Sequence, residues 1–115
     1  MDPDRARELL LRERRRIEEA LRRLEPTQSD ELTTSDQHLA DQATDVYEEE
    51  RDEGLADDLR AQLGAVARAE QRLAEGTYGL SIESGERIPD ERLEALPTAE
   101  RTAEEQSRFD RGASA

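Results

Sequence analysis

GTYGLSIESG fills residues 76–85, and it is followed by IP at residues 88–89 and by RLEALPTA at residues 92–99. Two short stretches that are typical of strands flank the turn signal Ser84-Gly85. Residues 90–96 favour one helical turn. This order of elements predicts a small lobe that contains a short β-hairpin and a helix.

The predicted lobe covers residues 76–111. Thr98 is expected to cap its last helix, which ends near Arg111, and residues 112–115 are expected to form a frayed tail. The large apolar side chains that could hold the lobe together are Tyr78, Leu80, Ile82, Ile88, Leu93, Leu96 and Phe109. Each of them stabilises a fold by roughly 1.5–3 kcal/mol when it is fully buried. We therefore expect a folded lobe that is the least stable part of the molecule.

The frame of this lobe resembles the zinc finger of the DksA/TraR family of bacterial transcription regulators. That family has the pattern GTYGxCxxCGxxIPxxRLEALPxAxxCxxC. The four cysteine positions of the pattern hold Ser81, Ser84, Thr102 and Glu105 in this chain. The resemblance implies a treble-clef-like lobe, and the substitutions imply that the lobe has lost its metal ligands.

The four replacement residues are a poor set of zinc ligands. Structural zinc is held by thiolates or imidazoles, whereas serine and threonine hydroxyls stay protonated at neutral pH. Glu105 alone cannot replace four thiolates. We expect neither a metal nor any other cofactor at these positions.

Composition narrows the fold class and the partners. The chain has 115 residues, of which 41% are charged and 33% hydrophobic, and its net charge is −13. So little apolar surface suits a helical hairpin, a coiled coil or a partly disordered chain. The negative charge argues against direct binding to nucleic acid or to an anionic membrane. With no cysteine, no long apolar run and an acidic amino terminus, we expect a cytoplasmic protein.

Two long helices are predicted before the lobe. The first spans residues 2–24, and Pro26 ends it because proline has no N–H to donate. A loop at residues 25–36 leads to a second helix at residues 37–75, after which Gly76 suits a left-handed C-cap. The first helix carries a heptad seam, namely Ala6, Leu10, Glu13, Ile17, Ala20 and Leu24. We therefore predict a mainly α fold, in which an antiparallel two-helix coiled-coil hairpin at residues 1–75 precedes the lobe.

Residues 36–43, DQHLADQA, stand at the start of the second helix. They resemble the coiled-coil tip of the same family, which one branch writes D-[NQ]-H-x-A-D. The resemblance implies that Asp36, His38, Asp41 and Ala43 contact RNA polymerase in its secondary channel. Asp41 would be the functional acid, and the small Ala43 would permit close approach. Alternatively, Asp41 is an ordinary first-turn acid that the helix dipole favours.

The resemblance implies a transcription regulator that binds RNA polymerase and modulates initiation without binding DNA. A monomer is expected, because the hairpin buries its own seam. The alternative is a helical adaptor that self-associates through Leu10, Ile17 and Leu24. We do not expect an enzyme, because the sequence offers no nucleophile with a base, no phosphate loop and no metal cluster.

Overall fold

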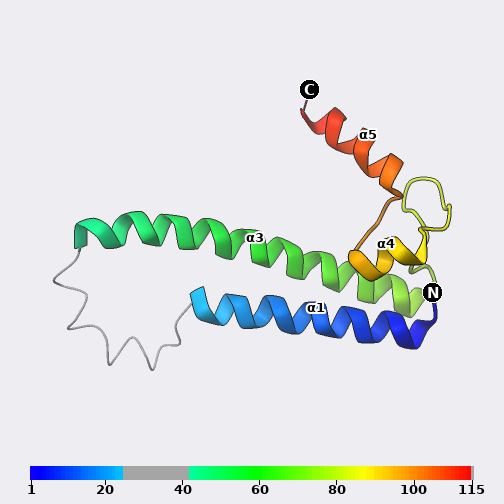
Figure 1. Ribbon diagram of the computed structural model, residues 1–115, viewed down its shortest axis with the longest axis horizontal. Helices are drawn as coiled ribbons and strands as arrows, with labels where there is room; N and C mark the ends of the chain where they lie inside the picture. The colour runs from blue at the N-terminus through cyan, green and yellow to red at the C-terminus, as the bar shows by residue number, and fades with distance from the viewer. Residues whose placement is uncertain (25–41, 115) are drawn as a thin grey trace. The chain divides into compact units, whose positions relative to one another are not determined.

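The computed structural model describes residues 1–24 and 42–114, and these residues form four helices (Figure 1). The helices are α1 (Pro3–Leu24), α3 (Gln42–Glu75), α4 (Asp90–Ala95) and α5 (Ala103–Ser114). The prediction of a mainly α fold is confirmed. The predicted loop at residues 25–36 and the predicted start of the second helix at residues 37–41 lie outside the described residues.

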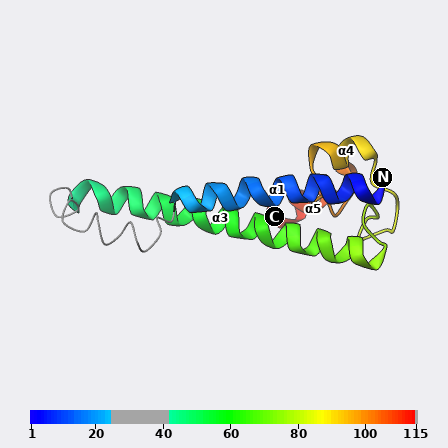
Figure 2. The ribbon, with the colours of Figure 1, turned by 90° about the horizontal axis from the view of Figure 1, so that it is seen from below.

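The chain divides into two compact units. The first joins Met1–Arg14 to Gly64–Ala115, and the second is Arg15–Leu63. Within each unit, its parts of α1 and α3 lie side by side and run in opposite directions (Figures 1 and 2). The division predicted at residues 75 and 76 and the details of a coiled-coil hairpin stay predictions. None of the described helices is long and apolar enough to cross a membrane.

Heptad positions of α1 are buried in both units. Ala6 and Leu10 are buried in the first unit, and Ile17 is buried in the second. The second unit also has a hydrogen bond from Arg16 to the side-chain oxygen of Gln62, at 3.1 Å. In the first unit, Arg14 holds the carboxylate of Glu70 through two nitrogens. Glu13, the one charged residue of the heptad seam, is half-buried.

The predicted β-hairpin is wrong. In the described part of the lobe, Leu80 and Arg87 form only an isolated antiparallel bridge. Pairing cannot extend, because Gly79 has a φ of 86° on one strand and Pro89 lacks an N–H on the other. The chain between the paired residues is a turn, closed by hydrogen bonds from Ser81 N–H to Glu86 O and from Gly85 N–H to Ser81 O.

The apolar core of the lobe is smaller than expected. Ile88, Leu93 and Ala99 are buried together, and Met1 and Tyr78 pack against them. The remaining large apolar side chains of the predicted set are exposed, namely Leu80, Ile82, Leu96 and Phe109. Packing of all seven residues therefore does not hold the lobe together.

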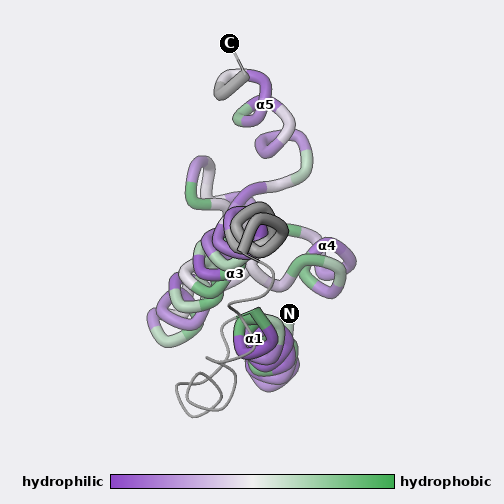
Figure 3. Tube along the Cα trace, turned by 90° about the vertical axis from the view of Figure 1, so that its left-hand side faces the viewer, coloured by the Kyte–Doolittle hydropathy of each residue, from purple (hydrophilic) through white to green (hydrophobic). Residues whose placement is uncertain are grey.

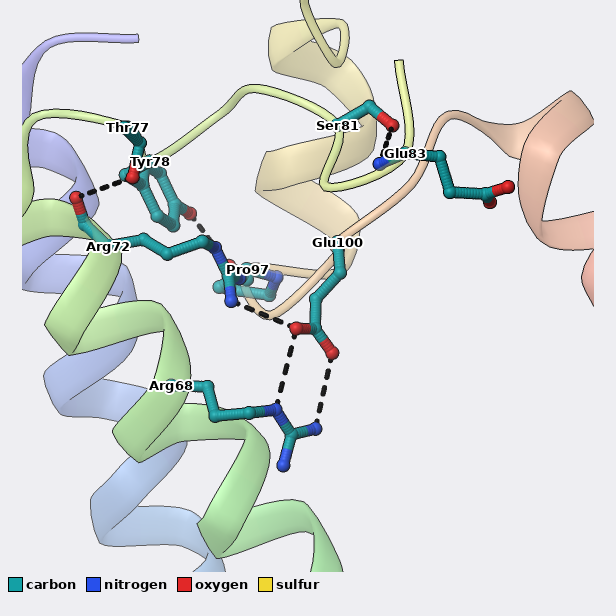
Figure 4. Close-up of polar contacts among 8 residues, drawn as sticks. All are labelled: Arg68, Arg72, Thr77, Tyr78, Ser81, Glu83, Pro97 and Glu100. Atoms are coloured by element: carbon teal, nitrogen blue, oxygen red, sulfur yellow. Dashed lines mark hydrogen bonds and ion pairs between the residues drawn. The ribbon is translucent and has the colours of Figure 1, made fainter. Parts of the chain in front are cut away.

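Polar contacts attach the lobe to the helices of the first unit. Glu100 accepts hydrogen bonds from Arg72, at 2.9 Å, and from Arg68, at 3.2 Å, and both arginines project from α3 (Figure 4). Tyr78 donates its hydroxyl to Pro97 O at 2.7 Å, and burial raises its pKa to about 12. Gly76 ends α3 with a φ of 79°, which confirms the predicted left-handed C-cap.

A second attachment joins the lobe to α1. The guanidinium of Arg5 donates two hydrogen bonds to Glu94, at 2.7 and 2.9 Å. These bonds lower the pKa of the Glu94 carboxyl. Bidentate arginine–carboxylate pairs fix orientation as well as distance, so this pair sets how α4 lies along α1.

We expect Glu100→Gln to destabilise the protein by about 1.5–3 kcal/mol, the usual worth of hydrogen bonds to a charged group. Arg72 is only 12% exposed and Glu100 18%, and Nε and Nη2 of Arg72 are buried without a hydrogen-bond partner among the described residues. Loss of the carboxylate charge would leave that guanidinium uncompensated. Urea unfolding measures the effect. Glu86→Gln, at an exposed position of the same lobe, serves as the control. Equal stability of the two variants would contradict the assignment.

Candidate functional site

Most of the predicted tip lies outside the described residues. This holds for Asp36, His38 and Asp41, whereas the backbone of Ala43 belongs to α3. Their role in contacting a partner stays a prediction.

The four positions of the zinc-finger frame all lie in the described lobe. Ser81 begins the turn that ends at Gly85. Its Oγ accepts a hydrogen bond from the N–H of Glu83 at 3.1 Å (Figure 4) and a second one from the N–H of Ser84 at 3.2 Å. A serine side chain that bonds to backbone N–H groups two and three residues later stabilises a tight turn. Because Ser81 is buried, these bonds replace the hydrogen bonds to water that its hydroxyl would make in the unfolded chain.

Thr102 and Glu105 form a reciprocal pair at the start of α5. The backbone N–H of Thr102 donates to Glu105 Oε1 at 2.8 Å, and the backbone N–H of Glu105 donates to Thr102 Oγ1 at 3.2 Å. This is a capping box, in which the cap residue and the third helical residue satisfy each other's N–H groups. The prediction that Thr98 caps this helix is therefore wrong. The Thr-x-x-Glu spacing at residues 102–105 is the signal that indicates the true cap.

The Glu105 carboxylate brings the four positions together. Glu105 is only 5% exposed. Its pKa is lowered to about 2, first by a hydrogen bond from the Ser84 side chain, then by the backbone of Thr102 and the side chain of Ser81. Hydrogen bonds to an ionised carboxylate favour the charged form. The turn at residues 81–85 and the start of α5 thus meet at one negative charge.

This arrangement does not fit zinc. Its donors are one carboxylate and hydroxyl groups, and the hydroxyls of Ser81 and Ser84 are engaged with Glu105. Zinc needs about four ligands with free lone pairs, mostly thiolate or imidazole. Among the described residues there is also no group of three or more His, Cys, Asp or Glu side chains that could hold a metal ion.

Sequence reasoning missed the ion pairs that surround this site. Arg101 donates to Glu83 at 2.7 Å and lies over the ring of Phe109, 3.9 Å from its centroid. Its backbone oxygen accepts a hydrogen bond from Arg92 at 3.0 Å. Residues 18 positions apart show no periodic pattern, so only the fold pairs Arg101 with Glu83.

The helices and the lobe define a mainly helical protein with a small C-terminal lobe, and a solved structure shares this fold. No protein-family model matches the chain. DksA, an RNA polymerase-binding transcription factor of Caulobacter vibrioides, is 34% identical over 96 residues, which are 82% of this chain and 68% of that protein. The structure of transcription factor DksA2 from Pseudomonas aeruginosa has a TM-score of 0.71 and 33% identity, and the match covers 98% of this chain and 86% of that one. The chain belongs to the DksA/TraR family, which confirms the resemblance seen in its motifs.

Two Bacillus subtilis proteins are also similar to the chain. The uncharacterized protein YteA is 46% identical over 74 residues, and General stress protein 16O is 42% identical over 72 residues. The matches cover 64% and 63% of this chain. They cover only 31% of YteA and 44% of General stress protein 16O, so the chain spans less than half the length of either protein.

Acid should weaken the lobe through Glu105. The folded-state pKa of this carboxyl is about 2, below its ordinary value of 4.5. A lowered pKa contributes stability that is fully present above the ordinary value and is lost as the pH falls towards the folded-state value. The unfolding free energy of wild type should therefore exceed that of Glu105→Gln most at neutral pH. The difference should shrink between about pH 5 and pH 2. Urea unfolding at several pH values measures it, and a difference that does not change with pH would contradict the assignment.

Proposed function

We propose that this protein binds RNA polymerase and modulates transcription initiation. The observation that carries this proposal is the 34% identity, over 82% of the chain, to a DksA that is named for binding RNA polymerase. The structural match to transcription factor DksA2 supports it over nearly the whole chain.

The tip motif specifies how binding would occur. Residues 36–43 would enter the secondary channel of the polymerase, where Asp41 would act as the functional acid. Ala43, with its small side chain, would allow close approach, and Asp36 and His38 would complete the contact. The motif DQHLADQA and the finger frame occur together in one chain, and two such matches are more specific than either alone.

Charge favours a protein partner over DNA. Residues 26–75 carry fourteen acids and four arginines, a net charge of −10. Exposed acids of the described part of α3 include Glu50, Glu53, Asp57 and Asp58. Such a surface repels phosphates, whereas it speeds encounter with a basic protein surface. The regulator would therefore act without binding DNA directly.

Self-association through the heptad seam is the alternative, and burial argues against it. Leu10 is 1% exposed and Ile17 is 0% exposed within a single chain. Leu24, the third residue of the self-association seam, is half-buried. A seam that is mostly covered has little apolar surface left to bury in a dimer. We therefore propose that the protein acts as a monomer.

The function is tested with core RNA polymerase, in a pull-down and in transcription from a purified promoter template. Wild type should bind the polymerase and change the yield of initiation. Asp41→Asn keeps the size of the side chain but removes its charge, so it should bind and lose the effect on initiation. Asp58→Asn makes the same change at an exposed position of α3 and should behave as wild type.

A photocrosslinking residue in place of Ala43 tests the site of contact. It should label polymerase segments that line the secondary channel. Wild-type protein that fails to bind the polymerase at all would reject the proposed function, and labelling elsewhere would reject the channel.

Analytical ultracentrifugation tests the oligomeric state. We expect a monomer at all concentrations. Ile17→Asp should lower the melting temperature without changing the mass, because it places a charge at a buried position. Leu11→Asp, at an exposed position of the same helix, should leave both unchanged. A wild-type dimer that Ile17→Asp dissociates would instead support the adaptor.

A further inference from the structure

We propose that the carboxylate of Glu105 performs the structural task that zinc has in a finger of this kind. This one buried anion connects the two halves of the lobe, which are the turn at residues 81–85 and the start of α5 at residues 102–105. A zinc ion in a treble-clef-like frame would tie the first pair of positions to the second pair. Here the first pair is Ser81 and Ser84, and the second is Thr102 and Glu105. The inference concerns the fold of the lobe and does not depend on the proposed function.

The hydrogen-bond capacity of Ser81 matches its surroundings. A hydroxyl has one proton to donate and two lone pairs to accept with. Ser81 Oγ accepts from the N–H groups of Glu83 and Ser84, which uses both lone pairs. Its single proton is then left for Glu105, because the Ser81 side chain is one of the groups that lower the pKa of that carboxyl. Ser81 therefore stabilises the turn and links the turn to α5 at the same time.

Only an ionised carboxylate can receive all of these donors. Its two oxygens offer about four acceptor sites and no proton. Glu105 receives the backbone N–H of Thr102 and the side chains of Ser84 and Ser81. Glutamine at this position has only one acceptor oxygen, and its amide group donates. It would offer too few acceptor sites for these three donors. A buried donor such as the Ser81 hydroxyl costs more when it is left without a partner than an exposed one does.

Two further contacts connect the same halves of the lobe. The backbone N–H of Ile82 donates to Glu100 O at 2.9 Å. Arg101 pairs with Glu83 on the turn and stacks on Phe109 of α5. Both contacts flank the Glu105 network and would keep its geometry in place.

Apolar burial does not explain how α5 is held. Ile82 and Phe109 are each 50% exposed. Past its first turn α5 is exposed through Gly112 and predominantly hydrophilic, as the hydropathy-coloured trace shows (Figure 3). Glu105 is the one buried residue in the described part of this helix. The connection between the halves is therefore mainly polar.

Hydrogen exchange of the full chain, followed by mass spectrometry, tests the proposal. Exchange is measured for wild type with added zinc chloride, with EDTA and without either. Amides of residues 81–86 and of the first turn of α5 should exchange equally in all three conditions. Glu105→Gln should exchange at these amides about tenfold faster, the size expected for the loss of one or two hydrogen bonds. Amides of α1 should be unchanged.

Glu104→Gln is the matched control, because it changes the neighbouring exposed glutamate of the same helical turn. A variant with cysteine at all four positions is the positive control for metal, and its lobe should become sensitive to EDTA. Faster exchange of the wild-type lobe in EDTA would overturn the proposal, as would a Glu105→Gln lobe that exchanges like wild type. If Glu105→Gln unfolds the whole chain, Ser84→Ala is measured in its place, because it removes only one donor to the carboxylate. Lobe amides of Ser84→Ala that exchange at the wild-type rate would also overturn the proposal.

Discussion

Three buried apolar side chains are a small core, so the lobe needs further stabilising interactions. The buried carboxylate of Glu105 is positioned to supply them. Ile88, Leu93 and Ala99 make up that core. The turn at residues 81–85 and α5 lie outside it, and they converge on one anion through hydroxyl and backbone donors. Since the charge is only 5% exposed, each donor is worth more than it would be in water.

Arginine–carboxylate pairs extend the same principle to the attachment of the lobe. Every basic residue of the chain except His38 is an arginine. The planar guanidinium can hold a carboxylate through two parallel bonds, as Arg5 does with Glu94. Arg68 and Arg72 together hold Glu100, which stands three residues before the start of α5. A chain with 33% hydrophobic residues thus orients its elements with directional polar contacts where others would use apolar area.

The lobe and the acidic part of α3 lie in different compact units, which suits the proposed function. The lobe and its attachments belong to the first compact unit, whereas the acidic part of α3 belongs to the second. Contact with a polymerase would be made by the tip residues, which need no metal for their chemistry. Replacement of the zinc ligands therefore changes how the lobe is stabilised and leaves the tip motif intact in the sequence.

The sequence by itself determined the family, the mainly helical fold and the left-handed cap at Gly76, because motif spacing, heptad period and glycine chemistry are local properties. It also contains the Thr-x-x-Glu signal of the α5 cap at residues 102–105. The tertiary structure alone decided that Leu80 and Arg87 form one bridge instead of a hairpin, and that Leu80, Ile82, Leu96 and Phe109 stay exposed. It alone brought Ser81 and Ser84 to Glu105 and Arg72 to Glu100, because such pairs are 20 or more residues apart and follow no period. Burial and long-range hydrogen bonding depend on which segments the folded chain places together, and no local pattern encodes that.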